Sequence, residues 1–105
     1  MTITPHAVQL AVAQTYGITL DRLRRHDRHA SIARARHVAM YLMRRLCGMS
    51  YPEIGRSLGN RHHATVMHGV CKVEFLVMDD RKLRTQVFEI ENKLRAAAEP
   101  AKEAA

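Results

Sequence analysis

The residues best equipped for chemistry in this sequence are cations and hydrogen-bond donors between positions 61 and 72. Four of them recur at intervals of three or four residues, with no acidic residue among them: Arg61, Thr65, His68 and Lys72. Such a helix face donates hydrogen bonds and carries positive charge, which suits the phosphate oxygens of a nucleic acid. A second basic run, RRHDRH at 24–29, is interpreted either as a solvated loop or as an arm that reaches into a phosphate-lined groove.

Other chemistries find less support in the sequence. His26 and His29 have an HxxH spacing, but a zinc site would need four ligands in a recognisable frame, and no cysteine is near. The adjacent His62 and His63 lack a carboxylate or a nucleophile for acid–base catalysis. The chain contains no GxxxxGK[ST] phosphate loop. We therefore predict that the protein is not an enzyme and needs no metal, cofactor or nucleotide.

Two helices joined by a tight turn are expected to position the basic face. Ser50 can cap the first helix with Glu53 three residues later, and Gly59 can end it in the left-handed conformation. A second helix is expected over 61–78, with a buried valine stripe at positions 66, 70, 73 and 77. This layout is typical of a DNA-binding helix-turn-helix, although an ordinary helical hairpin has the same pattern.

Four more helices complete the expected fold. The first runs between Thr4 and Gly17, a short second one over 19–25, and a third over 31–47, with Arg36 on its exposed side. The last follows 79–80 and has an apolar stripe at every third or fourth position. The fold class is therefore all-α, a compact bundle of about six helices without strands. We expect 1–97 to form one domain and 98–105 to form a flexible tail.

The composition indicates the class of partner and the cellular compartment of the protein. Lys and Arg number 17 against 10 Asp and Glu, a net charge of +7, which favours a polyanion such as nucleic acid. Cys47 and Cys71 fall inside predicted helices, and we expect buried free thiols in a reducing cytoplasm. The first residues lack the features of a signal peptide, and no apolar run could span a membrane. We expect a cytoplasmic, nucleoid-associated monomer.

Three blocks of sequence carry a family resemblance. ARARHVAMYL at 33–42, SYPEIG at 50–55 and GNRHHATVMH at 59–68 are similar to the long-helix block, the LSLPEIG block and the GxRDHTTVxH signature of one family. In this order and spacing the chain resembles the C-terminal DNA-binding domain of DnaA, the bacterial chromosomal replication initiator, also called domain IV. The match extends over about 3–94. Met1 directly before it and a non-matching tail after it favour a natural short relative.

The resemblance implies where DNA would lie. The second helix of the motif would dock in the major groove of a DnaA box, and Arg28 from the basic loop would enter the adjacent minor groove. His63 matches a base-contacting position of the family, as do His62 and Ala64. The residues that match phosphate-contacting positions, together with the lysine on the same basic face, are Arg36, Ser50, Tyr51, Arg61, Thr65, His68 and Lys72.

Two of the base-reading positions depart from the family pattern. His62 stands where the family has aspartate, and Ala64 where it has threonine. An aspartate accepts a hydrogen bond from cytosine N4, whereas a histidine offers a donor, and alanine keeps only apolar contact with a thymine methyl. Binding to DNA is therefore better supported than binding to a DnaA box.

Three functions remain open on the sequence. The first is sequence-preferring binding of double-stranded DNA in replication control or transcription regulation. The second is a largely non-specific nucleoid binder, because contacts to phosphates alone provide affinity without sequence. The third is a protein-interaction module that retains the fold and contacts other replication or transcription proteins.

Overall fold

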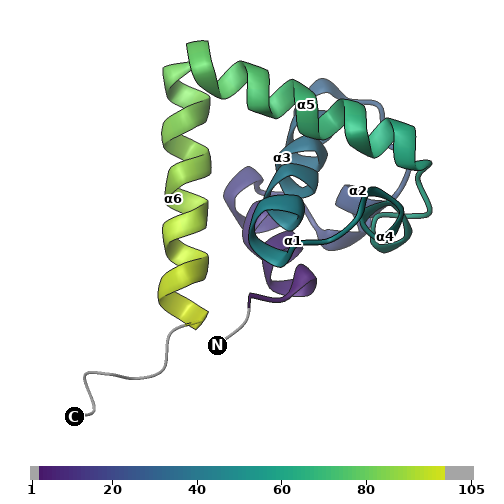
Figure 1. Cartoon of the computed structure of the whole chain (residues 1–105), viewed down its shortest axis with the longest axis horizontal. Helices are drawn as coiled ribbons and strands as arrows, with labels where there is room; N and C mark the ends of the chain where they lie inside the picture. The colour runs from purple at the N-terminus through teal and green to yellow at the C-terminus, as the bar shows by residue number, and fades with distance from the viewer. Residues whose placement is uncertain (1–2, 99–105) are drawn as a thin grey trace.

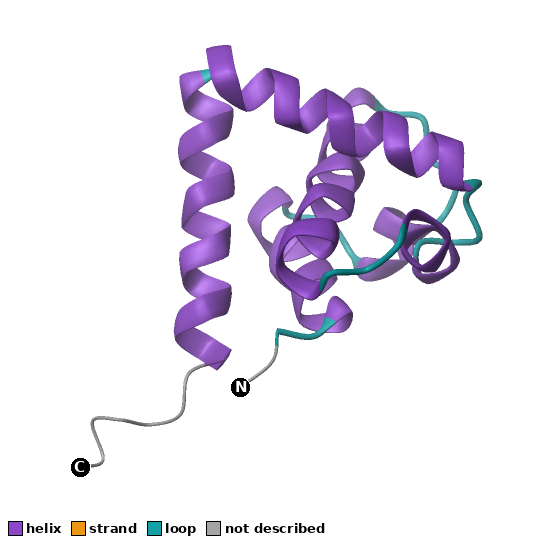
Figure 2. Cartoon of the chain, viewed as in Figure 1, coloured by secondary structure: helices purple, strands orange, loops and turns teal. Residues whose placement is uncertain are grey.

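The computed structural model describes residues 3–98, and helices connected by short loops make up nearly all of this part (Figures 1 and 2). The six helices are α1 (Pro5–Tyr16), α2 (Leu20–Arg24), α3 (Ala30–Cys47), α4 (Tyr51–Ser57), α5 (His63–Asp79) and α6 (Arg81–Ala98). Residues 3–98 contain no strand, so the all-α prediction is confirmed. The tail predicted for 98–105 lies outside the described residues, apart from Ala98 at the end of α6.

Local signals in the sequence set most of the helix ends. The Thr4 hydroxyl accepts the Ala7 N–H at 3.1 Å and starts α1. At α4, the Ser50 hydroxyl accepts the Glu53 N–H at 3.2 Å, and the Glu53 carboxylate accepts the Ser50 N–H at 2.8 Å. This reciprocal pair is the predicted capping box. Asp80 caps α6, since its Oδ1 accepts the Leu83 N–H at 3.0 Å.

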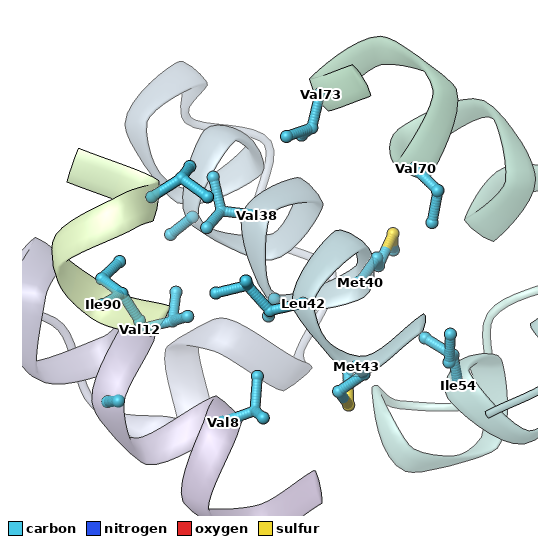
Figure 3. Close-up of a cluster of buried hydrophobic side chains, with 14 of the residues drawn as sticks. Val8, Val12, Val38, Met40, Leu42, Met43, Ile54, Val70, Val73 and Ile90 are labelled. Atoms are coloured by element: carbon cyan, nitrogen blue, oxygen red, sulfur yellow. The ribbon is translucent and has the colours of Figure 1, made fainter. Parts of the chain in front are cut away.

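The long helix α3 lies at the centre of the bundle and packs against α1, α2, α4 and α5 (Figure 1). α6 closes one side by packing against α1 and α5. Figure 3 shows side chains from α1, α3, α4, α5 and α6 that meet in this core, among them Val12, Leu42, Ile54, Val73 and Ile90. The predicted stripes of α5 and α6 are buried in this core, except for Val77, which is only half-buried.

α3 and α5 approach each other closely where Gly69 lies. A Cβ atom at this position would come within 2.7 Å of the Met40 sulfur and 2.9 Å of the His37 ring. The glycine thus lets α5 lie directly on α3. This close packing helps to set the position of α5 on α3.

The start of α5 and the burial of the two cysteines differ from the sequence predictions. α5 begins at His63, not at Arg61, because His62 is the N-cap and the Arg61 N–H donates to the Gly55 carbonyl in α4. Cys71 is exposed and Cys47 is only half-buried, so the expectation of buried thiols is wrong. Cys71 lies on the outer side of α5, away from the face that buries Val70 and Val73.

Candidate nucleic-acid interface

The turn between α4 and α5 is tightly packed. Gly59 and Asn60 both have left-handed backbones, with φ of 73° and 58°. The Arg61 N–H then donates to the Gly55 carbonyl at 2.9 Å and folds the chain back onto α4. A Cβ atom at Gly55 would lie 2.1 Å from the Arg61 carbonyl oxygen, so the turn has no room for a side chain there. α4, this turn and α5 form the helix-turn-helix that the sequence predicts.

The start of α5 presents two exposed histidines. The rings of His62 and His63 stack with their centroids 4.2 Å apart. His62 also caps the helix, because its Nδ1 accepts the Ala64 N–H at 3.1 Å. An Nδ1 that accepts leaves the proton of the neutral imidazole on Nε2, so the free nitrogen of His62 is a donor. Ala64 itself is half-buried.

Further along α5, the predicted phosphate-contacting residues Thr65, His68 and Lys72 are all exposed. Their spacing of three and four residues places them on one side of the helix. This side therefore offers one hydroxyl, one imidazole and one ammonium group to a ligand. It lies apart from the buried stripe that starts with Val66.

Two more predicted contacts lie where α4 begins. The Ser50 hydroxyl accepts the Glu53 N–H and still has its own proton to donate. Tyr51 is half-buried, and the Arg44 guanidinium lies 4.6 Å from its ring centroid, over the ring face. This cation–π contact orients the tyrosine and adds a positive charge beside it.

The basic loop between α2 and α3 is organised by Asp27. Its carboxylate accepts the His29 N–H at 3.0 Å, contacts the His29 Nδ1 at 2.7 Å and accepts a hydrogen bond from Arg22 at 2.9 Å. These contacts, with the two to His29 dominant, hold the pKa of the Asp27 carboxyl far below its usual range. Arg28 is exposed, and no hydrogen bond or ion pair from its side chain occurs within residues 3–98.

Arg36 lies in a different environment from the one predicted. Its side chain was expected on the exposed side of α3, but Arg36 is only 7% exposed, so this expectation is wrong. Its guanidinium donates to the carbonyls of Leu23 at 3.0 Å, Arg25 at 3.0 Å and Asp27 at 3.2 Å. The carbonyls at the end of α2 and in the basic loop therefore surround the charge and compensate for its burial.

Arg61 turns toward the same loop from the other side. Its guanidinium donates to the carbonyls of Arg24 at 2.7 Å and Arg25 at 2.8 Å, and also to that of Leu58. Burial, reinforced by the neighbouring Arg36 charge, lowers the pKa of Arg61 to about 10, so the group stays protonated at neutral pH. Both arginines thus direct donors toward the protein backbone.

One residue that supports the site gave no signal in the sequence. Gln9 on α1 is 1% exposed, and its side-chain oxygen accepts a hydrogen bond from the Arg24 Nε at 2.8 Å. Its amide donates to the Ser57 carbonyl at 3.3 Å, at the end of α4. Gln9 therefore ties the first residue of the basic run to the helix-turn-helix. A glutamine beside the apolar stripe of α1 looks like any solvent-facing residue until the partners are known.

The described part of the chain has neither a cluster of metal ligands nor a membrane-spanning helix. Between residues 3 and 98, no three His, Cys, Asp or Glu side chains gather as a metal ion requires. One nitrogen of His29, half of the HxxH pair, contacts Asp27. None of the helices in this range has the length and apolar character needed to cross a bilayer.

Sequence comparison finds relatives of this chain among known proteins. Residues 5–73 match the family model described as bacterial dnaA protein helix-turn-helix. The chain is 36% identical over 96 residues to the chromosomal replication initiator protein DnaA of Streptococcus uberis, and 38% identical over 96 residues to that of Streptococcus agalactiae. Each alignment covers 90% of this chain and 21% of the relative, so the chain spans about a fifth of their length. The chain belongs to the family of bacterial DnaA helix-turn-helix domains.

Proposed function

We propose that this protein binds double-stranded DNA, with the start of α5 in the major groove and the basic loop at the minor groove. The observation that carries the proposal is the junction of these two elements. Gly59 in the helix-turn-helix lies against the Arg24 carbonyl, and Arg61 bonds to both segments. A recognition helix and a basic loop held next to each other suit the adjacent grooves of one duplex.

The exposure and the chemistry of each side chain suggest its role in binding DNA. Arg28 would enter the minor groove, where a narrow A·T-rich groove attracts an arginine. His62, His63 and Ala64, at the N-terminal end of α5, would meet base edges. The exposed or half-exposed donors that would hold phosphates are Ser50, Tyr51, Thr65, His68 and Lys72.

The family and the relatives' names favour a role in the control of chromosomal replication, with transcription regulation as a related outcome. The altered positions His62 and Ala64 leave the preferred site open, and a DnaA box is one candidate. Non-specific binding is the second proposal, because the phosphate-contacting set is more complete than the base-reading set. A site reader and a non-specific binder differ in how far binding depends on sequence.

Binding selection from random duplexes, followed by titration at several salt concentrations, tests both proposals. If about five phosphates are neutralised, the slope of log K against log salt should lie near −4 to −5. An enriched motif supports a site-reading protein, and a steep slope without a motif supports the non-specific binder. No binding at low salt would reject both and favour an interaction module.

A further inference from the structure

The basic loop is held by an unusual set of hydrogen bonds. α2 ends at Arg24 after only 5 residues, and the carbonyls at its end have no continuing helix to accept from. Arg36 and Arg61 supply the missing donors: the carbonyls of Leu23, Arg24, Arg25 and Asp27 each accept from one or both of the two guanidinium groups. The backbone that precedes Arg28 is therefore fixed by side chains from elsewhere in the fold.

The geometry of these bonds requires arginine. A guanidinium is a rigid, planar fork with five donors, so one group reaches two or three carbonyls in fixed directions. A lysine ammonium carries the same charge but cannot form the same divided set of bonds. Replacing one of these arginines by lysine would therefore keep its charge but remove the shape that forms these bonds.

Arg61 connects two parts of the proposed interface. It donates to Arg24 and Arg25 in the loop region and to Leu58 in the turn before α5. Gly59 adds to this contact, because a Cβ atom there would lie 2.2 Å from the Arg24 carbonyl oxygen. A shift of the loop would therefore disturb the turn from which α5 starts.

We infer that Arg36 and Arg61 are positioning residues that hold the basic loop for Arg28, and that Arg61 couples this loop to the recognition helix. The inference rests on the proposed DNA binding and replaces the phosphate-contacting role expected for both arginines. Arg36 is buried beneath the loop, and its Nε and one terminal nitrogen already donate to carbonyls. These bonds leave only the second terminal nitrogen, Nη1, to reach a phosphate, so a two-pronged grip through Nε and Nη2 would need them to break.

The first test needs no DNA. Amide hydrogen exchange is measured at Asp27, whose N–H donates to the Arg25 carbonyl, and at His29, whose N–H donates to the Asp27 carboxylate. We expect both amides to exchange about tenfold faster in Arg36→Gln and Arg61→Gln. Arg45→Gln is the matched control, since Arg45 is exposed and pairs with Glu91 on α6. Unchanged exchange in both variants would overturn the inference, whatever the DNA results.

The second test is a double-mutant cycle on DNA with Arg28→Ala and Arg61→Lys. Lysine keeps the charge, and this variant is used where Arg61→Gln fails to fold. If Arg61 is a positioning residue, Arg28→Ala should cost much less affinity in the Arg61→Lys protein than in the wild type. The salt slope of the Arg61→Lys protein should equal that of the wild type. Additive losses, or a salt slope that falls by about 0.9 in Arg61→Gln, would show a phosphate contact instead. If the wild-type protein binds no duplex, the proposed function fails, and hydrogen exchange alone decides the positioning role.

Discussion

The guanidinium of Arg61 donates to the main-chain oxygen of Arg24 at 2.7 Å, across the boundary between the helix-turn-helix and the basic loop. The two residues are 37 positions apart in the sequence. Because Arg61 also bonds to Leu58, the loop and the turn before α5 share one set of hydrogen bonds. The element proposed for the minor groove is thereby fixed relative to the element proposed for the major groove.

Gly59→Ala should destabilise the fold more than Gly48→Ala. Both glycines have left-handed backbones, with φ of 73° and 64°, and each alanine bears a cost of about 1 kcal/mol for that conformation. Only Gly59 faces a close neighbour, the Arg24 carbonyl oxygen, whereas Gly48 has open space around it. We expect a loss of about 2–4 kcal/mol for Gly59→Ala, measured by urea unfolding. Equal losses in the two variants would show that the loop moves aside without cost.

Arg28→Ala should weaken DNA binding by about tenfold on sites with A·T-rich flanks. An exposed arginine at the tip of a fixed loop gains most from a narrow minor groove, where the negative potential is enhanced. Affinities for duplexes that differ only in their flanks provide the measurement. An equal loss on G·C-rich flanks would reduce Arg28 to a phosphate contact, and no loss would return the loop to its solvated interpretation.

The sequence predicts those structural features that are determined by residues close together in the chain. Threonine and serine caps, the capping box of Ser50 and Glu53, and the apolar stripes all lie within a few residues of the features that they determine. The order of the six helices and the helix-turn-helix follow from them. The start of α5 was missed by two residues because Arg61 is used by the turn and His62, an uncommon cap, takes the N-cap position.

The roles of the arginines could not be predicted in the same way. Arg28 and Arg36 look alike as charges in the sequence, yet one is exposed and the other is 7% exposed. The difference comes from carbonyls that the fold brings to Arg36 from α2 and the loop. Gln9 is a similar case, because its partners Arg24 and Ser57 are distant in sequence.

Stability should fall at acid pH in two steps. Burial, with the charges of Lys72 and three arginines added, lowers the pKa of His37 below its ordinary value of 6.5. As the pH falls, the unfolded chain therefore binds the His37 proton before the folded chain does. The stabilisation that results from this difference is present above pH 6.5 and is lost as the pH falls toward the pKa of His37 in the folded protein. The lowered pKa of Asp27 adds a second loss below its ordinary value of 3.8.

Urea unfolding at a series of pH values checks both steps. His37→Gln should flatten the plot of unfolding free energy against pH just below pH 6.5, and Asp27→Asn should flatten it below pH 3.8. A wild-type stability that is constant from neutral pH down to about pH 5 would contradict the role given to His37.

Lys72→Ala should weaken binding to all duplexes by a similar factor and reduce the salt slope by about 0.9, as expected for the loss of one ammonium–phosphate contact. Lys72 is exposed on the same side of α5 as His68. Lys82→Ala is the matched control, since Lys82 is exposed on α6, outside the proposed interface. A change of sequence preference in Lys72→Ala, with the salt slope retained, would mean that the lysine reads bases.

The base preference of the protein should follow the free nitrogen of His62. With Nδ1 engaged by the Ala64 N–H, Nε2 donates, so His62 should favour the acceptors guanine N7 and O6 over the cytosine N4 amino group, which is itself a donor. Such a contact discriminates by about 1–3 kcal/mol, which shifts the preferred site without abolishing binding.

His62→Asp combined with Ala64→Thr should restore a preference for the DnaA box over the selected site. Aspartate is a strong N-cap residue, so α5 keeps its first turn, and its carboxylate can accept from cytosine N4. The salt slope should change little, because neither residue is proposed to hold a phosphate. Competition between the two duplexes, measured for the wild type and for the double variant, decides the matter. A wild-type protein that already prefers the DnaA box, or a double variant without sequence preference, would show that His62 does not set the site.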